Sequence, residues 1–374
     1  MEAIIWIAAA IIVYFTGTGK KQGQGKDRKE KLYLGCSLFA ALCCEFAIKV
    51  VFHIHYLSIW LILTYALIAA QCSRMLWIFI CIPEKRNQVY SMSIKMAVGM
   101  GILAFYYVNL SRDVIGVTKI ANQFPPVSTG MADLMLLAAT AIWIYGTDVL
   151  RRFPECARAI YWIFLAITPF LAFFLEELCW NPSVTGISLL NGELNVLIYL
   201  ILEVIFVCLM QKGTLGLQAL YIFAWLVGAL NYYLLKFRGQ PFLATDIFAL
   251  RTAMSVAGQY TFEVAEELAF TFLILYFLFT CMWALGKMEI FQKRTGKKRI
   301  LIKGCGAIGA AAALFFWIGS YDFPDTYNIW IDFWAQVNTY QTTGFAPAFI
   351  SFWQRMKISK PDGYTEQSAE QIFD

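Results

Sequence analysis

Four charged side chains lie close together in the segment from residue 231 to 267, which reads NYYLLKFRGQPFLATDIFALRTAMSVAGQYTFEVAEE. They are Lys236, Arg238, Asp246 and Arg251. A guanidinium offers a fork of donors that matches phosphate oxygens, and an ammonium adds a point charge. These residues therefore predict a binding site for an anionic phosphate. Asp246 would either hold one arginine in place or accept a hydroxyl of a glycerol headgroup, and the sequence leaves both roles open.

The same segment has a second interpretation, as an ordinary helix at the membrane surface. Gly239 and Pro241 end the preceding helix, and Thr245 or Asp246 can cap a short new one. Its apolar residues recur at helical spacing: Ile247, Leu250, Met254 and Ala257. A solvated helix whose basic side chains extend to the headgroups fits this pattern as well as an anion-binding groove does.

The elements that hold this segment must span a membrane. The chain has 374 residues, of which 60% are hydrophobic and 17% aromatic, with a mean hydropathy of +0.61. Apolar runs near 20 residues recur, which predicts an all-α, polytopic bundle of about ten transmembrane helices with additional extracellular interfacial helices. We place the spans at residues 3–16, 33–53, 57–82, 94–110, 133–150, 159–175, 194–211, 216–235, 268–286 and 304–320.

The loop charges orient these spans. Most of the 30 basic residues follow the odd-numbered spans, as in the runs 20–31 and 293–303, and basic residues concentrate in cytoplasmic loops. We therefore expect both termini and the segment 236–267 to lie outside the cell. The net charge of +5 follows from this topology and predicts no nucleic-acid partner.

Titratable groups inside the spans are few. The candidates are Glu45 with Lys49, Arg74, Asp148 and Glu203, and the only histidines are His53 and His55. Glu45 and Lys49 are spaced to neutralise each other on one helix face. The histidines lack a third ligand nearby, so we predict no metal site. The lack of a deeply buried histidine also disfavours a membrane-embedded acyltransferase.

Two features concern the last third of the chain. Small residues between Gly306 and Ala313 predict that the tenth span is buried against the bundle, with a dimer face as the competing interpretation. Beyond it are two aromatic-rich stripes: Ile329, Trp330, Phe333, Trp334 and Val337, then Phe345, Phe349, Phe352, Trp353 and Met356. Both predict helices lying in the membrane interface. After Ile358 the composition is polar and predicts a linker.

These runs carry a resemblance to a known family. The first 30 residues of the charged segment, followed by YDFPDTYNIWIDFWAQVNTYQTTGFAPAFISFW and KPDGYTEQSAEQI, resemble the membrane domain and linker of lipoteichoic acid synthase-like phosphoglycerol transferases. The matching residues are Arg238, Pro241, Asp246, the turn Tyr321, Asp322, Phe323 and Pro324, and the pair Gly344 and Phe345.

The resemblance implies a division of the chain. Residues 1–158 form an N-terminal five-span region without a recognised relative, and residues 159–320 form a five-span core with the external amphipathic segment 236–267. Residues 321–374 form an extracellular linker of interfacial helices that leads toward a catalytic domain outside this sequence.

The resemblance also implies a reaction. In that family a sulfatase-like extracellular domain carries a threonine nucleophile and a divalent metal, Mn²⁺ or Mg²⁺, and transfers glycerol phosphate from phosphatidylglycerol to a growing polymer. We therefore expect no catalytic residue, metal ligand or cofactor in this chain. The implied partners are phosphatidylglycerol or another anionic lipid, and a sulfatase-like domain in cis or in trans.

The sequence thus predicts the membrane-anchoring, lipid-presenting part of a phosphoglycerol transferase in a bacterial cell membrane. The alternative is a stand-alone transporter or flippase for a lipid-linked or anionic substrate. A transporter would need polar, broken helices in the middle of the membrane, and Pro169 is the clearest proline within a span.

Overall fold

The computed structural model describes scattered positions between residues 63 and 78, and residues 86–109, 129–210, 212–248, 264–286 and 296–356. Every regular element in these ranges is a helix. The expected spans 3–16 and 33–53, most of 57–82, the segment 249–263 with Arg251, and residues 357–374 lie outside the described residues.

The longer helices form the bundle. They are α4 (Arg86–Asn109), α6 (Thr129–Ala141) with η3 (Ile142–Gly146) and α7 (Thr147–Leu150), α8 (Pro154–Glu177), α9 (Leu189–Leu209), α10 (Gly213–Arg238), α12 (Glu266–Leu285) and α13 (Gly296–Ser320). Short elements are η4 (Val184–Gly186), α14 (Phe323–Tyr327), α15 (Gln336–Thr343) and α16 (Phe345–Arg355).

Six of these helices are long and apolar enough to cross a membrane: Ala132–Leu150, Pro154–Glu177, Leu189–Leu209, Gly213–Arg238, Glu266–Leu285 and Ile300–Ser320. They coincide with the last six spans expected from the sequence. These six apolar helices suit a multi-pass membrane protein. The expected span 94–110 overlaps α4, whose apolar part, Met92–Leu103, is shorter than these six. A total of about ten spans stays a prediction.

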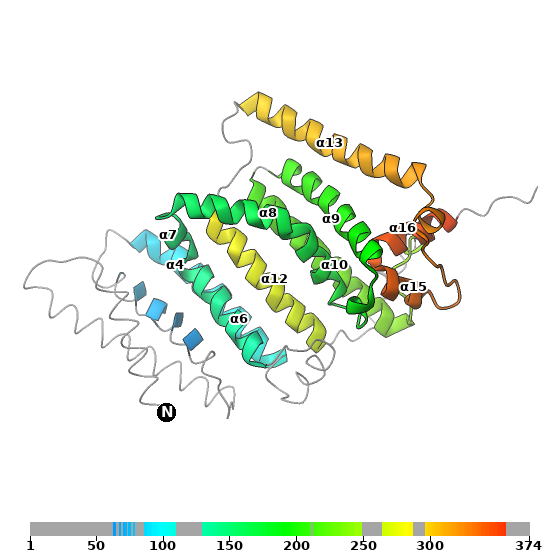
Figure 1. Cartoon of the computed structure of the whole chain (residues 1–374). Coiled ribbons are helices and arrows are strands. Elements are labelled where there is room, and N and C mark those ends of the chain that lie inside the picture. The colour runs from blue at the N-terminus through cyan, green and yellow to red at the C-terminus, as the bar shows by residue number, and fades with distance from the viewer. Residues whose placement is uncertain are drawn as a thin grey trace, which may run out of the picture.

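Helix α12 lies at the centre of the bundle (Figure 1). It packs on α6 and η3 on one side and on α10 and α8 on the other. Its sequence is apolar around its whole circumference, as expected of a helix enclosed by others. Leu273 and Tyr276 belong to the core shared with α6, whereas Leu278 and Met282 belong to the core shared with α8, α9 and α10.

Two glycines of α10 allow its neighbours to approach closely. A Cβ atom at Gly216 would lie 2.5 Å from the Cα of Val207 in α9, and one at Gly228 would lie 2.8 Å from the Cβ of Cys179, just beyond α8. Small residues at helix contacts let backbones meet where lipid provides no hydrophobic drive. The two glycines therefore hold α8, α9 and α10 together as one tight unit.

The expectation that the tenth span is buried was wrong for the part of the chain that the structure describes. Helix α13 lies along the edge of the bundle, where it packs on α9 (Figure 1). Only 11% of its apolar stretch within Ile300–Ser320 is buried. Gly306 does face α9, with its Cβ position 2.9 Å from Cys208 Sγ. Other small residues, such as Gly304 and Gly309, have no atom within 4 Å of a Cβ position. Small residues permit close packing, but they do not supply a partner.

The prediction of a first interfacial helix, starting at Ile329, was also wrong. Residues 329–335 are not helical, because Asn328 ends α14 in the left-handed conformation with φ 52°. The carboxylate of Asp332 then accepts the backbone N–H groups of Trp334 and Ala335 at 3.0 and 2.8 Å. These N–H bonds compete with a helix and form a turn instead.

The second stripe does form an amphipathic helix, α16. Its apolar face packs on the bundle, since Ala348 and Phe352 join a core with Cys179, Trp180 and Ala229. The placement of this helix in the membrane interface stays a prediction.

Candidate functional site

Chain segments that are far apart in the sequence meet at one end of the bundle, where α8 and α10 end and α9 begins (Figure 1). We call residues 239–248 and 321–356 together the platform. Hydrogen bonds join it to α8, α9, α10 and α13. Most of the site residues predicted from the sequence lie within it.

Arg238 and Asp246 form an ion pair on the platform. Nη1 of Arg238 donates to Oδ1 of Asp246 at 2.6 Å, and Nη2 donates to Oδ2 and to the carbonyl of Pro241. The pair can form because Gly239, with φ 72°, ends α10 and lets the chain turn back toward the helix. Of the two roles left open for Asp246, the structure shows that it holds Arg238.

The turn after α10 is held by hydrogen bonds from α10 and from α15. Asn231 of α10 accepts the backbone N–H of Phe242 at 2.9 Å, and the hydroxyl of Tyr340 donates to the Phe242 carbonyl at 3.0 Å. Tyr340 is fully buried, and this burial raises the pKa of its hydroxyl. Tyr340 therefore remains a neutral donor and ties α15 to the segment that carries Asp246.

Two adjacent carboxyl groups lie buried at the end of α8. Glu177 accepts the side-chain N–H of Asn181 at 2.7 Å and the backbone N–H of Phe345 at 2.6 Å. Glu176 accepts Trp180 Nε1 at 2.9 Å and Asn231 Nδ2 at 3.3 Å, both through Oε1. These bonds connect α8, α10 and the start of α16 in one polar network.

The junction between α15 and α16 rests on α9. Nδ2 of Asn195 donates to the Thr343 carbonyl at 2.8 Å, and Oδ1 of Asn195 accepts the Ala346 N–H at 3.3 Å. Gly344 lies between them with φ 86°, and a Cβ atom there would overlap the Asn195 amide. Only glycine satisfies both the conformation and the space.

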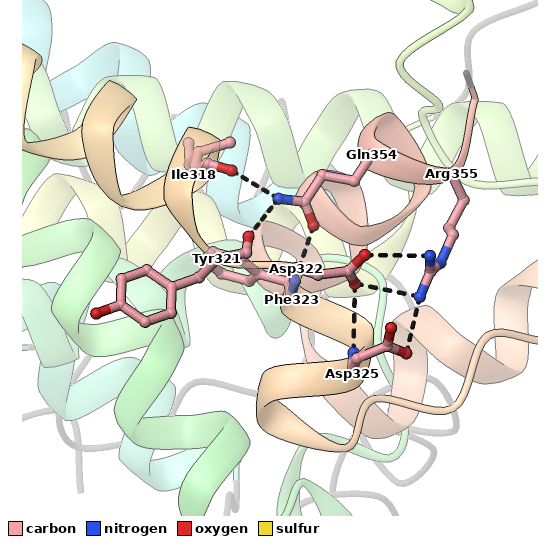
Figure 2. Close-up of polar contacts among 7 residues, drawn as sticks. All are labelled: Ile318, Tyr321, Asp322, Phe323, Asp325, Gln354 and Arg355. Carbon is pink, nitrogen blue, oxygen red and sulfur yellow. Dashed lines mark hydrogen bonds and ion pairs between the residues drawn. The ribbon is translucent and has the colours of Figure 1, made fainter. Parts of the chain in front are cut away.

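The far end of α16 is bound to the start of α14 by exposed charges and to the end of α13 by the amide of Gln354 (Figure 2). Arg355 donates to Asp322 at 3.1 Å and to Asp325 at 2.9 Å. Gln354 donates to the carbonyls of Ile318 and Tyr321 and accepts the Phe323 N–H at 2.9 Å. Asp322 also caps α14 by accepting the Asp325 N–H.

The predicted site residues thus divide into groups. Arg238 and Asp246 are brought together. Asp322 pairs with Arg355, and the Tyr321 carbonyl accepts the Gln354 amide. Gly344 packs against Asn195 of α9, and the Phe345 N–H donates to Glu177 of α8. Lys236 is exposed on the last turn of α10.

Trp330 and Trp334 project from the turn between α14 and α15, with 83% and 100% of their surface exposed. Between them, Asp332 is held in its ionised form, because the bond from the Ala335 N–H lowers the pKa of its carboxyl. Whether these two rings contact lipid stays a prediction.

Sequence reasoning missed the residues that bind the platform to the bundle: Glu176, Glu177, Asn181, Asn195, Asn231 and Gln354. The adjacent pair of glutamates at the end of an apolar run was a visible signal, because charges there are costly unless partners satisfy them. The partners themselves lie at sequence separations of up to 168 residues.

Comparisons with known proteins gave no assignment. A scan against family models, a search of curated proteins and a search of solved structures each found no match to this chain. Among the described residues, no group of three or more His, Cys, Asp or Glu side chains could hold a metal ion.

Proposed function

We propose that this chain is the membrane-anchoring and lipid-presenting part of a phosphoglycerol transferase, which acts on phosphatidylglycerol at the outer leaflet of a bacterial membrane. The resemblance described above motivates the reaction class. The chain would hold the lipid headgroup, and a sulfatase-like domain in cis or in trans would supply the chemistry.

The observation that carries the proposal is the rigid attachment of the platform. The start of α16 is hydrogen-bonded to Glu177 of α8 and its end, through Gln354, to the Ile318 carbonyl of α13, so residue 356 has a defined position at the end of the bundle where α10 ends. A catalytic group attached there would meet the headgroup at high effective concentration and in a restricted orientation. A flexible tether would provide neither.

Arg238 retains the capacity to bind an anion. A guanidinium has five N–H donors, and Asp246 and Pro241 engage three of them, which leaves two. Asp246 also holds the guanidinium in a fixed orientation. We propose that the remaining donors bind a phosphate oxygen and that Lys236 and Arg251 add positive charge, in keeping with their expected location outside the cell.

The test is the lipid preference of the purified chain. Phosphatidylglycerol and phosphatidylcholine are titrated by native mass spectrometry against wild type and Arg238→Ala. The variant should lose about 1 to 3 kcal/mol of binding free energy for phosphatidylglycerol alone, as expected for a hydrogen bond to a charged group. Arg238→Lys should recover part of this loss, because lysine keeps the charge but not the fork.

The matched control is Arg158→Ala. Arg158 is an exposed arginine that pairs with Glu155 near the start of α8, whereas the platform contacts the end of α8. The Arg158→Ala variant should keep the preference of wild type for phosphatidylglycerol over phosphatidylcholine. Equal preference in wild type and Arg238→Ala, with both folded, would contradict the proposal and leave a surface helix with ordinary basic side chains.

One observation favours the second candidate, a transporter or flippase. Helix α8 contains Pro169 beside Thr168, whose hydroxyl lies 2.7 Å from the Tyr221 hydroxyl in the buried core. Polar groups beside an interrupted helix occur at transport sites. Reconstituted vesicles with a fluorescent phosphatidylglycerol distinguish the two functions: protein-dependent movement between leaflets would support transport, and its absence would support presentation alone.

A further inference from the structure

Glu203 is a buried carboxyl group within the membrane-spanning part of the chain. It lies in α9, and only 2% of its surface is exposed. Neither of its carboxylate oxygens has a hydrogen-bond partner among the described residues. By contrast, both oxygens of the equally buried Glu177 accept N–H groups at 2.7 Å or less.

Among the described residues, no positively charged side chain pairs with Glu203. It occurs in α9 at the helical spacing of Tyr199 and Val207, both of which lie in the core shared with α8 and α10. Tyr221 of α10 is close enough to interact with it electrostatically. The Thr168 hydroxyl donates to the Phe164 carbonyl at 2.7 Å, so Tyr221 must donate to Thr168.

Lys303 of α13 is a buried basic group near the end of α9. Its ammonium donates to the Met210 carbonyl, beyond the end of α9, at 2.9 Å. On the α10 side, Gly216 brings the backbones of α9 and α10 into contact at Val207, one helical turn from Glu203. With 2% of its surface exposed, a charged Glu203 carboxylate would have little hydration and no pairing partner among the described residues, which is costly in a membrane.

We propose that Glu203 is a proton-binding site in the membrane-spanning bundle, carried as a neutral carboxylic acid in the closed structure. The ligand is a single proton, taken up by one carboxylate oxygen with no other bond formed or broken. The tight α9–α10 contact allows exchange of this proton only when these helices separate. The proposal does not depend on the phosphoglycerol transferase function.

Infrared difference spectroscopy of the reconstituted chain at neutral pH tests the site. Subtracting the spectrum of Glu203→Gln from that of wild type should leave the carbonyl band of one neutral carboxylic acid. Other buried acids, such as Glu176, cancel in the difference. The control is Glu193→Gln, an exposed glutamate on the same helix, which should instead remove the two bands of an ionised carboxylate.

The unfolding temperature of Glu203→Gln and the infrared spectrum of Glu203→Asp provide two further tests of whether Glu203 is neutral. Glutamine resembles a neutral glutamic acid, so Glu203→Gln should unfold at the same temperature as wild type. If that variant does not fold, Glu203→Asp should shift the neutral carbonyl band rather than remove it. Carboxylate bands in the difference spectrum of either variant would overturn the proposal, because they would mean that Glu203 is ionised and paired with a group outside the described residues.

Discussion

The two ends of α16 are held by similar chemistry in different surroundings. At its start, the Phe345 N–H donates to Glu177, which is fully buried. At its end, Arg355 donates to Asp322 and Asp325, whose side chains remain well exposed. Carboxylates are the acceptors at both ends, so the difference lies in access to water.

This difference determines what each contact contributes to stability. Water can replace a lost partner at the exposed end, and salt screens the charges, so exposed pairs contribute little. At the buried end, removal of the acceptor leaves donors without water, and each such donor costs about 1 to 3 kcal/mol. The comparison predicts that the start of α16 fixes the platform and that the ion pairs at its end only adjust its angle to α14.

The largest effect is expected from Gly344→Ala. Alanine disfavours φ 86°, and its methyl group would overlap the Asn195 amide. Together, strain and overpacking should lower the free energy of unfolding by about 3 to 5 kcal/mol. Thermal unfolding in detergent micelles measures the change. The control is Gly192→Ala in α9, where a Cβ atom meets nothing within 4 Å, and a loss there equal to that of Gly344→Ala would contradict the assignment.

A smaller but clear loss is expected from Glu177→Gln. One carboxylate oxygen becomes an N–H donor and faces the donors of Asn181 or Phe345, so the stability should fall by about 2 kcal/mol. Amide hydrogen exchange should show lost protection at Phe345. Glu193→Gln, on an exposed site, should change stability by less than about 0.5 kcal/mol, and unchanged protection of Phe345 in the Glu177 variant would show that this bond does not hold α16.

The smallest effect is expected from Arg355→Ala. Its two ion pairs are exposed, so the loss should stay below about 1 kcal/mol and shrink further at high salt. Unfolding measured at two ionic strengths checks both statements. A loss that exceeds that of Glu177→Gln would reverse the comparison and make the exposed end the main attachment.

Much of the fold could be predicted from the sequence. The six candidate spans follow from apolar runs long enough to cross a bilayer, and the break after α10 follows from Gly239 and Pro241. Less of the platform could be predicted, because an aromatic stripe does not reveal a competing turn. At residues 329–335, the side chain of Asp332 and the left-handed Asn328 outweighed the apolar spacing.

The sequence by itself determined that the chain is helical, where six helices long and apolar enough to cross a membrane lie, and that Arg238 and Asp246 lie near one helix end. These properties depend on local composition and chain geometry. Only the tertiary structure decided that α12 is enclosed while α13 lies at the edge, that Glu177 binds the start of α16, and that Glu203 has no partner among the described residues. The physical reason is that burial and hydrogen bonding depend on neighbours that are distant in the chain. The type of an apolar or acidic residue does not reveal whether that residue is buried or exposed, or whether it has a hydrogen-bond partner.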